Sequence, residues 1–563
     1  MKIRMSLASL LFLCCCLATT ALAQTTEDPL TKTVDQLFAT WDKPESPGAA
    51  VAVIKDGAVV YKRGYGSANL EYNVPITPQT VFHVASVSKQ FTAFAITLLA
   101  SQGKLSLDDD IRKHLPEVPD FGKKITIRHL IHHTSGLRDQ WTLLSMAGWR
   151  MDDVITKEHI MKMVRHQKEL NFDPGAENLY SNTGYTLLAV IVERVSGQSF
   201  REYTEANIFK PLGMTNTHFH DDHERIVKNR AYSYLPAGPG GGLKAAPLNY
   251  ANVGATSLFT TAEDLARWVL NFEDKKIGGA DVIKQMHQKG VLNTGKELGY
   301  AFGLSIGPYR GLNTVGHAGG DAAYRSFAMW FPDQRFGVVV LSNFGLLNPQ
   351  QMGMRIADIC LADKLAAEPP KPAAVERKVV KVDAAILESY AGRYLMDGRN
   401  LVVISKEGDK LMGQPGTAPK AELIPQSETT FFVKEANADL TFERDEKGNV
   451  VRFTMKGVSQ TQTAKRLNAP ATTTQLTEFT GDYYSPELGT SYTLVVKDGK
   501  LVAQHRRHDD IPLTEVDGDL FSSNRWFFQN VEFTRDSEKR ITGFRLSSGR
   551  AKNVRFDRQE KGS

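Results

Sequence analysis

Cysteine is scarce in this chain of 563 residues, and three of its four cysteines lie within the first 23 residues. Those residues carry Lys2 and Arg4, an apolar run over 7–17, and Ala-Leu-Ala before Gln24. These are the three parts of a cleavable secretory signal peptide. We therefore predict that residues 1–23 are removed on export. The exported chain would keep Cys360 alone, which excludes an intramolecular disulfide.

Long apolar runs and a strong net charge are also missing. The run over residues 7–17 is shorter than the roughly 20 residues of a membrane-spanning helix, and no later run is longer. We expect a secreted or periplasmic bacterial protein with no membrane span in the exported chain. The formal charge of +5 is nearly balanced, at 68 basic against 63 acidic side chains, so nothing favours nucleic acid as a partner.

The length predicts more than one domain. Strand patterns at 48–61 and 324–341 enclose a largely helical middle. This arrangement predicts an α+β domain over residues 24–365, in which one antiparallel sheet joins both ends of the segment. Residues 366–382 contain three prolines and several charges, and we interpret them as a semi-rigid linker.

The remainder of the chain repeats itself, as residues 383–468 and then 469–563. Tyr-Ala-Gly-Arg-Tyr at 390–394 corresponds to Phe-Thr-Gly-Asp-Tyr at 479–483, an offset of 89 residues that grows only to 91 by the last shared motif. Short alternating runs between turn residues predict two small antiparallel barrels or meanders. The pattern leaves open whether they close separately or share one core.

The segment 82–89, Phe-His-Val-Ala-Ser-Val-Ser-Lys, leads into a helical pattern. Ser86 and Lys89 would lie one turn apart on one face, so the hydroxyl and the amine can meet. A helix start points N–H groups at the oxyanion that acyl transfer develops, and a desolvated lysine can accept a proton. Ser101 and Lys104 repeat the spacing, but at the far end of the helix, where the dipole is negative.

Tyr180-Ser181-Asn182 follows Asp-Pro-Gly at 173–175 and precedes an apolar helical pattern. A loop in that position can present side chains to a cleft. A phenol near an ammonium group should have a lowered pKa and could act as a base toward the serine. The similar Tyr-Ala-Asn at 250–252 has no helix after it, and we rank it lower.

A glycine-rich segment, Gly316-His317-Ala318-Gly319-Gly320, precedes a strand pattern at 324–331. Its glycines would let a substrate backbone lie against the chain, as an edge strand pairs with a peptide-like acyl group. The N–H of Gly320 could be a second oxyanion donor beside that of Ser86. His317 could orient or protonate Tyr180.

In this order, the three motifs resemble the serine β-lactamase and penicillin-binding protein superfamily. The central Tyr-x-Asn is similar to the class C branch, which includes D-aminopeptidases, D,D-carboxypeptidases and esterases. The resemblance covers roughly residues 30–363 and implies a β-lactamase/transpeptidase-like domain. The roles that it implies are these: Ser86 as the acylated nucleophile, Lys89 and Tyr180 as the base pair, Asn182 as a ligand for the substrate amide, and His317, Ala318, Gly319 and Gly320 as the strand beside the substrate.

One departure bears on the substrate. Class C β-lactamases have Lys-Thr-Gly where this chain has His317-Ala318-Gly319, and an imidazole is mostly neutral at pH 7. We therefore expect a hydrolase of peptides, amides or esters, a D-amino-acid peptidase, carboxypeptidase or esterase, ahead of a β-lactamase. Its substrate would be a small-molecule or peptide acyl compound, with peptidoglycan fragments as one source. The alternative from another class is a non-catalytic peptidoglycan-binding or regulatory homologue.

Three other signals are set aside. Gly-x-Ser-x-Gly at 303–307 is followed by Pro308 rather than by the helix of an α/β-hydrolase elbow. The histidines and aspartates of 218–223 lack a second ligand group at zinc spacing, so we expect no metal and no cofactor. Adjacent His132 and His133 fit a structural loop of the family.

Overall fold

The computed structural model describes residues 29–367, 379–396, 400–416, 418–457, 461–467 and 473–560. The predicted signal peptide, residues 1–23, and most of the predicted linker, 366–382, lie outside these ranges. Among the residues that are described, no helix is both long enough and apolar enough to cross a bilayer.

A six-stranded antiparallel sheet organises the N-terminal half, in the order β12-β13-β14-β15-β1-β2. Its strands are β1 (Ala49–Lys55), β2 (Ala58–Tyr65), β12 (Ser305–Tyr309), β13 (Leu312–Asp321), β14 (Tyr324–Phe331) and β15 (Phe336–Ser342). The central pair joins the two ends of the segment, with Ala49 opposite Ser342 and Lys55 opposite Phe336. This confirms the predicted α+β sheet. The predicted glycine-rich segment differs, because it forms strand β13 itself.

Successive residues of β1 point to opposite faces of the sheet and therefore pack into two different hydrophobic cores. Val51 and Val53 pack with α1 (Pro29–Phe38) and α11 (Pro349–Cys360) on one face of the sheet. Ala52 and Ile54 face the opposite core, which the other helices of this half build. The sheet is therefore covered on both faces, and every residue of its central strand β15 is buried.

The helical half lies against the second face of the sheet. Its helices are α2 (Ser88–Ser101), α3 (Ile127–Ile131), α4 (Gln140–Met146), α5 (Lys157–His166), α6 (Asn182–Ser196), α7 (Phe200–Thr204), α8 (Lys210–Leu212), α9 (Ala262–Asp274) and α10 (Gly279–Met286). Short strands accompany them: β3 (Ser67–Asn69), β4 (Val74–Pro75), β5 (Phe82–His83), β6 (Ile155–Thr156), β7 (His218–Phe219), β8 (Tyr234–Pro236), β9 (Leu243–Ala245), β10 (Tyr250–Ala251) and β11 (Leu258–Thr260). Helices α2 and α6 pack against each other, and the cleft that carries the predicted motifs is lined by Asn182 at the start of α6 and by Ser86 in the turn before α2.

The repeats form two closed eight-stranded barrels, which answers whether they close separately. The first contains β16 (Gly392–Met396), β17 (Asn400–Glu407), β18 (Lys410–Pro415), β19 (Ala421–Pro425), β20 (Thr430–Val433), β21 (Ala438–Arg444), β22 (Val450–Lys456) and β23 (Thr461–Arg466), after α12 (Ala384–Tyr390). The second contains β24 (Gly481–Ser485), β25 (Thr490–Lys497), β26 (Lys500–His505), β27 (His508–Asp517), β28 (Leu520–Ser522), β29 (Asn530–Arg535), β30 (Ile541–Ser548) and β31 (Ala551–Arg558), after α13 (Thr473–Leu476). Closure leaves neither sheet with an open edge.

The two barrels share internal details. Tyr394 donates a hydrogen bond to the carbonyl of Tyr390 at 2.8 Å, and Tyr483 donates one to that of Phe479 at 2.9 Å. Each tyrosine ring packs among the phenylalanines of its own barrel. The repeat in the sequence is therefore a repeat of core structure.

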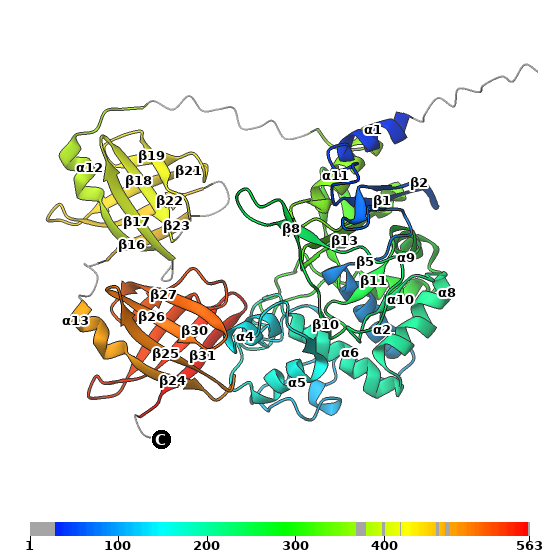
Figure 1. Cartoon of the computed structure of the whole chain (residues 1–563), viewed down its shortest axis with the longest axis horizontal. Helices are drawn as coiled ribbons and strands as arrows, with labels where there is room; N and C mark the ends of the chain where they lie inside the picture. The colour runs from blue at the N-terminus through cyan, green and yellow to red at the C-terminus, as the bar shows by residue number, and fades with distance from the viewer. Residues whose placement is uncertain are drawn as a thin grey trace, which may run out of the picture.

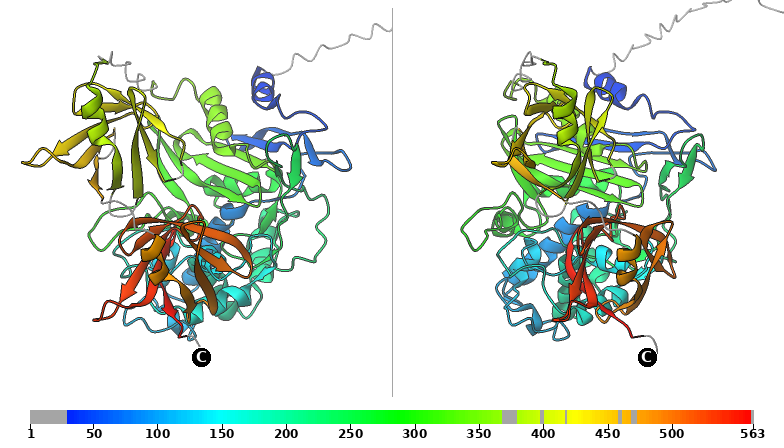
Figure 2. Two further views of the ribbon diagram at one scale, coloured as in Figure 1. Left: turned by 60° about the vertical axis from the view of Figure 1, so that its left-hand side comes forward. Right: turned by 90° about the vertical axis from the view of Figure 1, so that its left-hand side faces the viewer.

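The two barrels are placed differently relative to the N-terminal half of the chain. Figures 1 and 2 show the second barrel, in orange and red, against the region of α4. Leu143, Leu144 and Met146 of that region share one apolar cluster with Tyr492 and other barrel residues. The first barrel contacts the second, where the Arg393 guanidinium donates to the Val516 carbonyl at 3.0 Å. The second barrel is thus the one that reaches the cleft.

Candidate active site

Ser86 lies in a short 3₁₀ turn, Ala85–Val87, directly before α2. The turn is strained, because Ala85 has a φ of +45° in the left-handed region that side chains disfavour. Strand β14 holds it in place, since the Ser326 hydroxyl donates to the Val84 carbonyl at 2.7 Å. The predicted helical spacing to Lys89 is kept, with the serine in the 3₁₀ turn rather than in the α-helix.

Lys89 is fully buried beneath the serine. Its Nζ lies 3.0 Å from Ser86 Oγ, 2.9 Å from Asn182 Oδ1 and 2.7 Å from the Ala255 carbonyl oxygen. The last two atoms can only accept hydrogen bonds. A neutral amine would therefore donate both of its hydrogens to them and direct its lone pair at the serine hydroxyl.

Burial lowers the pKa of Lys89 to about 7. The negative charges of Asp321 and Asp139 oppose this shift, and the positive charge of Arg550 adds to it. A buried ammonium group loses its hydration, so burial favours the neutral amine over the charged form. The amine can therefore accept a proton near neutral pH.

Tyr180 lies close to the amine, with the centroid of its ring 4.9 Å from Lys89 Nζ and 4.1 Å from the ring centroid of His133. Burial raises the pKa of Tyr180 above its ordinary value, although the nearby Ser86 hydroxyl and the Arg550 charge oppose the rise. The expected lowering of this pKa is therefore wrong, because desolvation outweighs the neighbouring charge. Within the described residues, the phenol oxygen is buried and forms no hydrogen bond.

Asn182 begins α6, and both the nitrogen and the oxygen of its side-chain amide have hydrogen-bond partners. Asp139 accepts from both its backbone N–H, at 2.7 Å, and its Nδ2, at 2.8 Å. Since a carboxylate only accepts, the amide oxygen must face Lys89. Asn182 orients the lysine in this structure and also lines the cleft, so its role as a ligand for the substrate amide stays a prediction. Asp139 was missed, and its one local signal is its position as N-cap of α4.

The edge of β13 forms one wall of the site. Strand β12 pairs with β13 only as far as Gly316, whereas β14 pairs with it to Asp321. The segment from His317 to Asp321 therefore has one unpaired side, and it lines the cleft. Only glycine fits at position 319 beside Ser86, because a Cβ there would lie 2.4 Å from the Val84 carbonyl oxygen and 3.0 Å from Ser86 N.

His317 is buried, and burial lowers its pKa to about 4, with the charge of Lys89 adding to the effect. It is neutral at pH 7, as the sequence predicted. Its Nε2 lies 3.1 Å from the Tyr300 hydroxyl, and its Nδ1 contacts the Ala318 carbonyl. The hydrogen bond thus goes to Tyr300 rather than to Tyr180, whose ring centroid is 6.3 Å away.

The cleft has a volume of about 950 Å³. All the predicted substrate-side residues line it together with the serine and tyrosine: Ser86, Tyr180, Asn182, His317, Ala318, Gly319 and Gly320. The structure thus brings three segments distant in sequence to one place. Four residues of the second barrel complete the wall: Trp526, Gln529, Gly549 and Arg550. No local motif marks these four.

The two serines that were set aside lie where they were expected, whereas one tyrosine that was ranked low does not. Ser101 is exposed at the end of α2, and Ser305 begins a strand without an elbow. The described residues contain no group of three metal-ligating side chains. The tyrosine is Tyr250, which lines the cleft and stacks on Trp141 with ring centroids 4.7 Å apart.

Comparison with known sequences shows which protein family this chain resembles. The β-lactamase family matches residues 31–360, and a domain of unknown function, DUF3471, matches residues 376–470. Penicillin-binding protein 4* of Bacillus subtilis is 29% identical over 438 residues, which cover 73% of this chain and 93% of that protein. The D-aminopeptidase of Gluconobacter oxydans is 28% identical over 338 residues, 59% of this chain and only 60% of the enzyme's length.

Solved structures give the same assignment. The octameric penicillin-binding protein homologue from Pyrococcus abyssi is 27% identical with a TM-score of 0.55, covering 77% of this chain and 99% of its own. The penicillin binding protein from Bacillus halodurans is 25% identical with a TM-score of 0.52, covering 59% and 99%. Since the family match extends over more than half of the 563 residues, the chain belongs to the β-lactamase family of serine hydrolases.

Proposed function

We propose that this protein is an exported serine hydrolase that cleaves a peptide, amide or ester bond through an acyl-enzyme on Ser86. The observation that carries the proposal is the buried amine of Lys89, held by two carbonyl acceptors and 3.0 Å from the serine oxygen. Export rests on the signal-like residues 1–23.

In the acylation step, Lys89 takes the proton of Ser86 Oγ while that oxygen attacks the substrate carbonyl carbon. The carbonyl π electrons move to oxygen, and the N–H groups of Ser86 and Gly320 stabilise the resulting oxyanion. The substrate backbone would add to the unpaired side of β13, an arrangement in which main-chain hydrogen bonds give affinity.

Collapse of the tetrahedral intermediate expels an amine or an alkoxide, which must gain a proton. Tyr180 is suited to deliver it, because its raised pKa keeps the phenol protonated at neutral pH and its hydroxyl lies near Ser86. Lys89 then returns its proton to the phenolate. A water molecule, activated by the same groups, hydrolyses the acyl-serine.

The substrate that we favour is a D-amino-acid peptide or amide, or an ester. The relatives named as D-aminopeptidase and as penicillin-binding protein motivate this choice, with peptidoglycan fragments as one source. The neutral His317 disfavours a dedicated β-lactamase, since no permanent cation stands at that position of β13.

The test is turnover by the full exported chain on four substrates: nitrocefin, a p-nitrophenyl ester, a D-amino acid p-nitroanilide and a D-Ala-D-Ala peptide. We expect Ser86→Ala to abolish turnover. The matched control is Ser101→Ala, which removes the other serine of a Ser-x-x-Lys pair and should retain wild-type rates. Equal rates for wild type and Ser86→Ala would refute the proposal, and no turnover of any substrate would favour a binding protein.

A further inference from the structure

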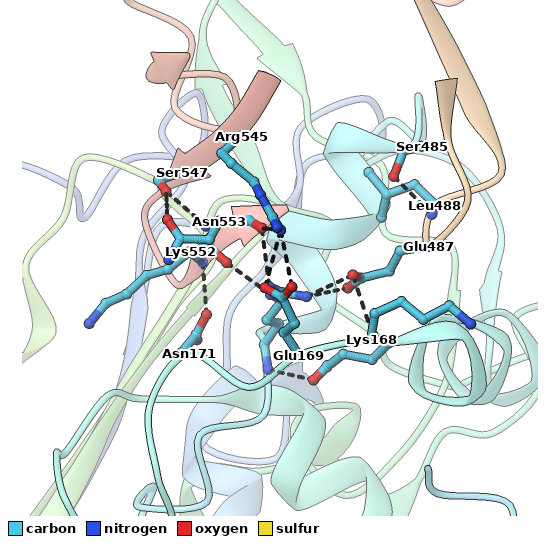
Figure 3. A network of polar contacts seen from close by, with 12 residues as sticks. Lys168, Glu169, Asn171, Ser485, Glu487, Leu488, Arg545, Ser547, Lys552 and Asn553 are labelled. Carbon is cyan, nitrogen blue, oxygen red and sulfur yellow. Dashed lines mark hydrogen bonds and ion pairs between the residues drawn. The ribbon is translucent and has the colours of Figure 1, made fainter. Parts of the chain in front are cut away.

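The second barrel is fixed to the N-terminal half by a buried ion pair. Arg138 is 1% exposed, and its Nη1 lies 2.8 and 2.7 Å from the two carboxylate oxygens of Glu487, which is 4% exposed. Its Nε donates to the Lys552 carbonyl at 3.0 Å. Figure 3 shows the surrounding network, in which Glu169 faces Arg545 of the barrel at 3.2 Å. These contacts set the barrel in one position.

That position brings the turn between β30 and β31 into the cleft. The carbonyl oxygen of Arg550 accepts from the backbone N–H of Asp139 at 3.2 Å and from Asn171 Nδ2 at 2.9 Å. Asn171 Oδ1 accepts in turn from the N–H of Lys552 at 2.7 Å. The backbone of the turn is thus tied to the residue that anchors Asn182.

The side chain of Arg550 lies over the proposed proton donor. Its guanidinium carbon is 4.7 Å from the centroid of the Tyr180 ring, and the residue lines the cleft. It forms no ion pair with any residue that the structure describes. Its positive charge therefore faces the cleft without a paired carboxylate.

The carboxylates of the cleft are already engaged. Asp139 accepts from Asn182 and from the N–H groups at the start of α4. Asp321 accepts from Thr256 and lies 3.1 Å from His83 Nε2, and its charge attracts Arg325. Asp139 and Asp321 therefore balance local donors, while the Arg550 charge is left for a ligand.

We propose that Arg550 is a specificity-determining residue that binds a carboxylate of the substrate beside the scissile bond. This inference rests on the proposed hydrolase function and names its substrate class: acyl compounds whose leaving group carries a free carboxylate. Arginine suits the task because its charge is permanent and its N–H groups match both carboxylate oxygens. The second barrel thereby supplies the cation that β13 lacks at His317.

The test compares two thioesters with one acyl group, N-acetyl-D-alanyl thioglycolate and its methyl ester, on the full chain. We expect Arg550→Met to lower kcat/KM for the carboxylate by about 10- to 100-fold, the worth of a charge-assisted hydrogen bond, and for the methyl ester by less than about 3-fold. Arg550→Lys should recover part of the loss. The matched control is Arg540→Ala, in the turn at the opposite end of β30, which should leave both rates unchanged.

Equal losses on the two thioesters would overturn the inference, because Arg550 would then act on the catalytic groups rather than on the substrate. A wild-type enzyme that hydrolyses the methyl ester at least as well as the carboxylate would also overturn it, while leaving the hydrolase function intact. Turnover of neither thioester by wild type, with no acyl adduct on Ser86, would instead contradict the proposed function itself.

Discussion

Removing the charge of Glu487 tests how much its buried ion pair with Arg138 stabilises the docked position of the second barrel. Glu487→Gln keeps the size of the side chain and leaves the Arg138 guanidinium buried without its counter-ion. Breaking a buried pair in this way costs about 3–5 kcal/mol. Two barrel carbonyls still accept from Arg138, and a carboxylate oxygen of Glu169 lies 3.6 Å from its guanidinium. We therefore expect a free-energy loss at the lower end of this range, about 3 kcal/mol.

A loss of about 3 kcal/mol raises the undocked fraction by about 100-fold. Hydrogen exchange followed by mass spectrometry should therefore show faster exchange in α4 and in the β30–β31 turn, with the strands of the barrel unchanged. The control is Arg138→Met combined with Glu487→Leu, which replaces the pair by apolar groups and should be neutral or stabilising. Unchanged exchange in α4 after Glu487→Gln would refute the reasoning, and the apolar cluster at the interface would then be the whole attachment.

Three further predictions concern the chemistry. The kcat/KM for acylation should rise with pH around a midpoint near 7, since only the neutral amine of Lys89, reached as pH rises through its lowered pKa, can take the serine proton; a flat profile from pH 5 to 9 would contradict this. Tyr180→Phe removes only the hydroxyl and should lower kcat by about 10²- to 10⁴-fold with an unchanged circular dichroism spectrum, so a near wild-type rate would remove the tyrosine from the mechanism. Gly319→Ala drives a methyl group into the Val84 carbonyl and should destabilise thermal unfolding by about 1–3 kcal/mol and slow acylation, whereas Gly307→Ala, with open space around it, should do neither.

Much of the site could be predicted because its reactive residues lie in short sequence motifs. Ser86 and Lys89 are three residues apart, and helical geometry alone brings them together. The sheet was predictable for a similar reason, since the apolar strand patterns at the two ends of the domain had to pair. The repeat of motifs at an offset of 89 residues likewise predicted two related barrels or meanders.

What escaped prediction depends on contacts between distant parts of the chain. Arg550 lies 370 positions after Tyr180 in the sequence, and only the docked barrel brings them together. Asp139 carries no local signal beyond its position as the N-cap of α4, and only the folded chain brings it against Asn182. The pKa of Tyr180 was predicted with the wrong sign, because burial is a property of the folded molecule and here outweighs the neighbouring charge.

The central claim is that the chain acts through an acyl-enzyme on Ser86. It is tested most directly by acid-quenching the reaction with N-acetyl-D-alanyl thioglycolate methyl ester and mapping the adduct by peptide mass spectrometry. The account predicts one acyl group on the peptide that contains Ser86, absent from Ser86→Ala and retained in Ser101→Ala. An adduct on another residue, or turnover that survives Ser86→Ala, would contradict it.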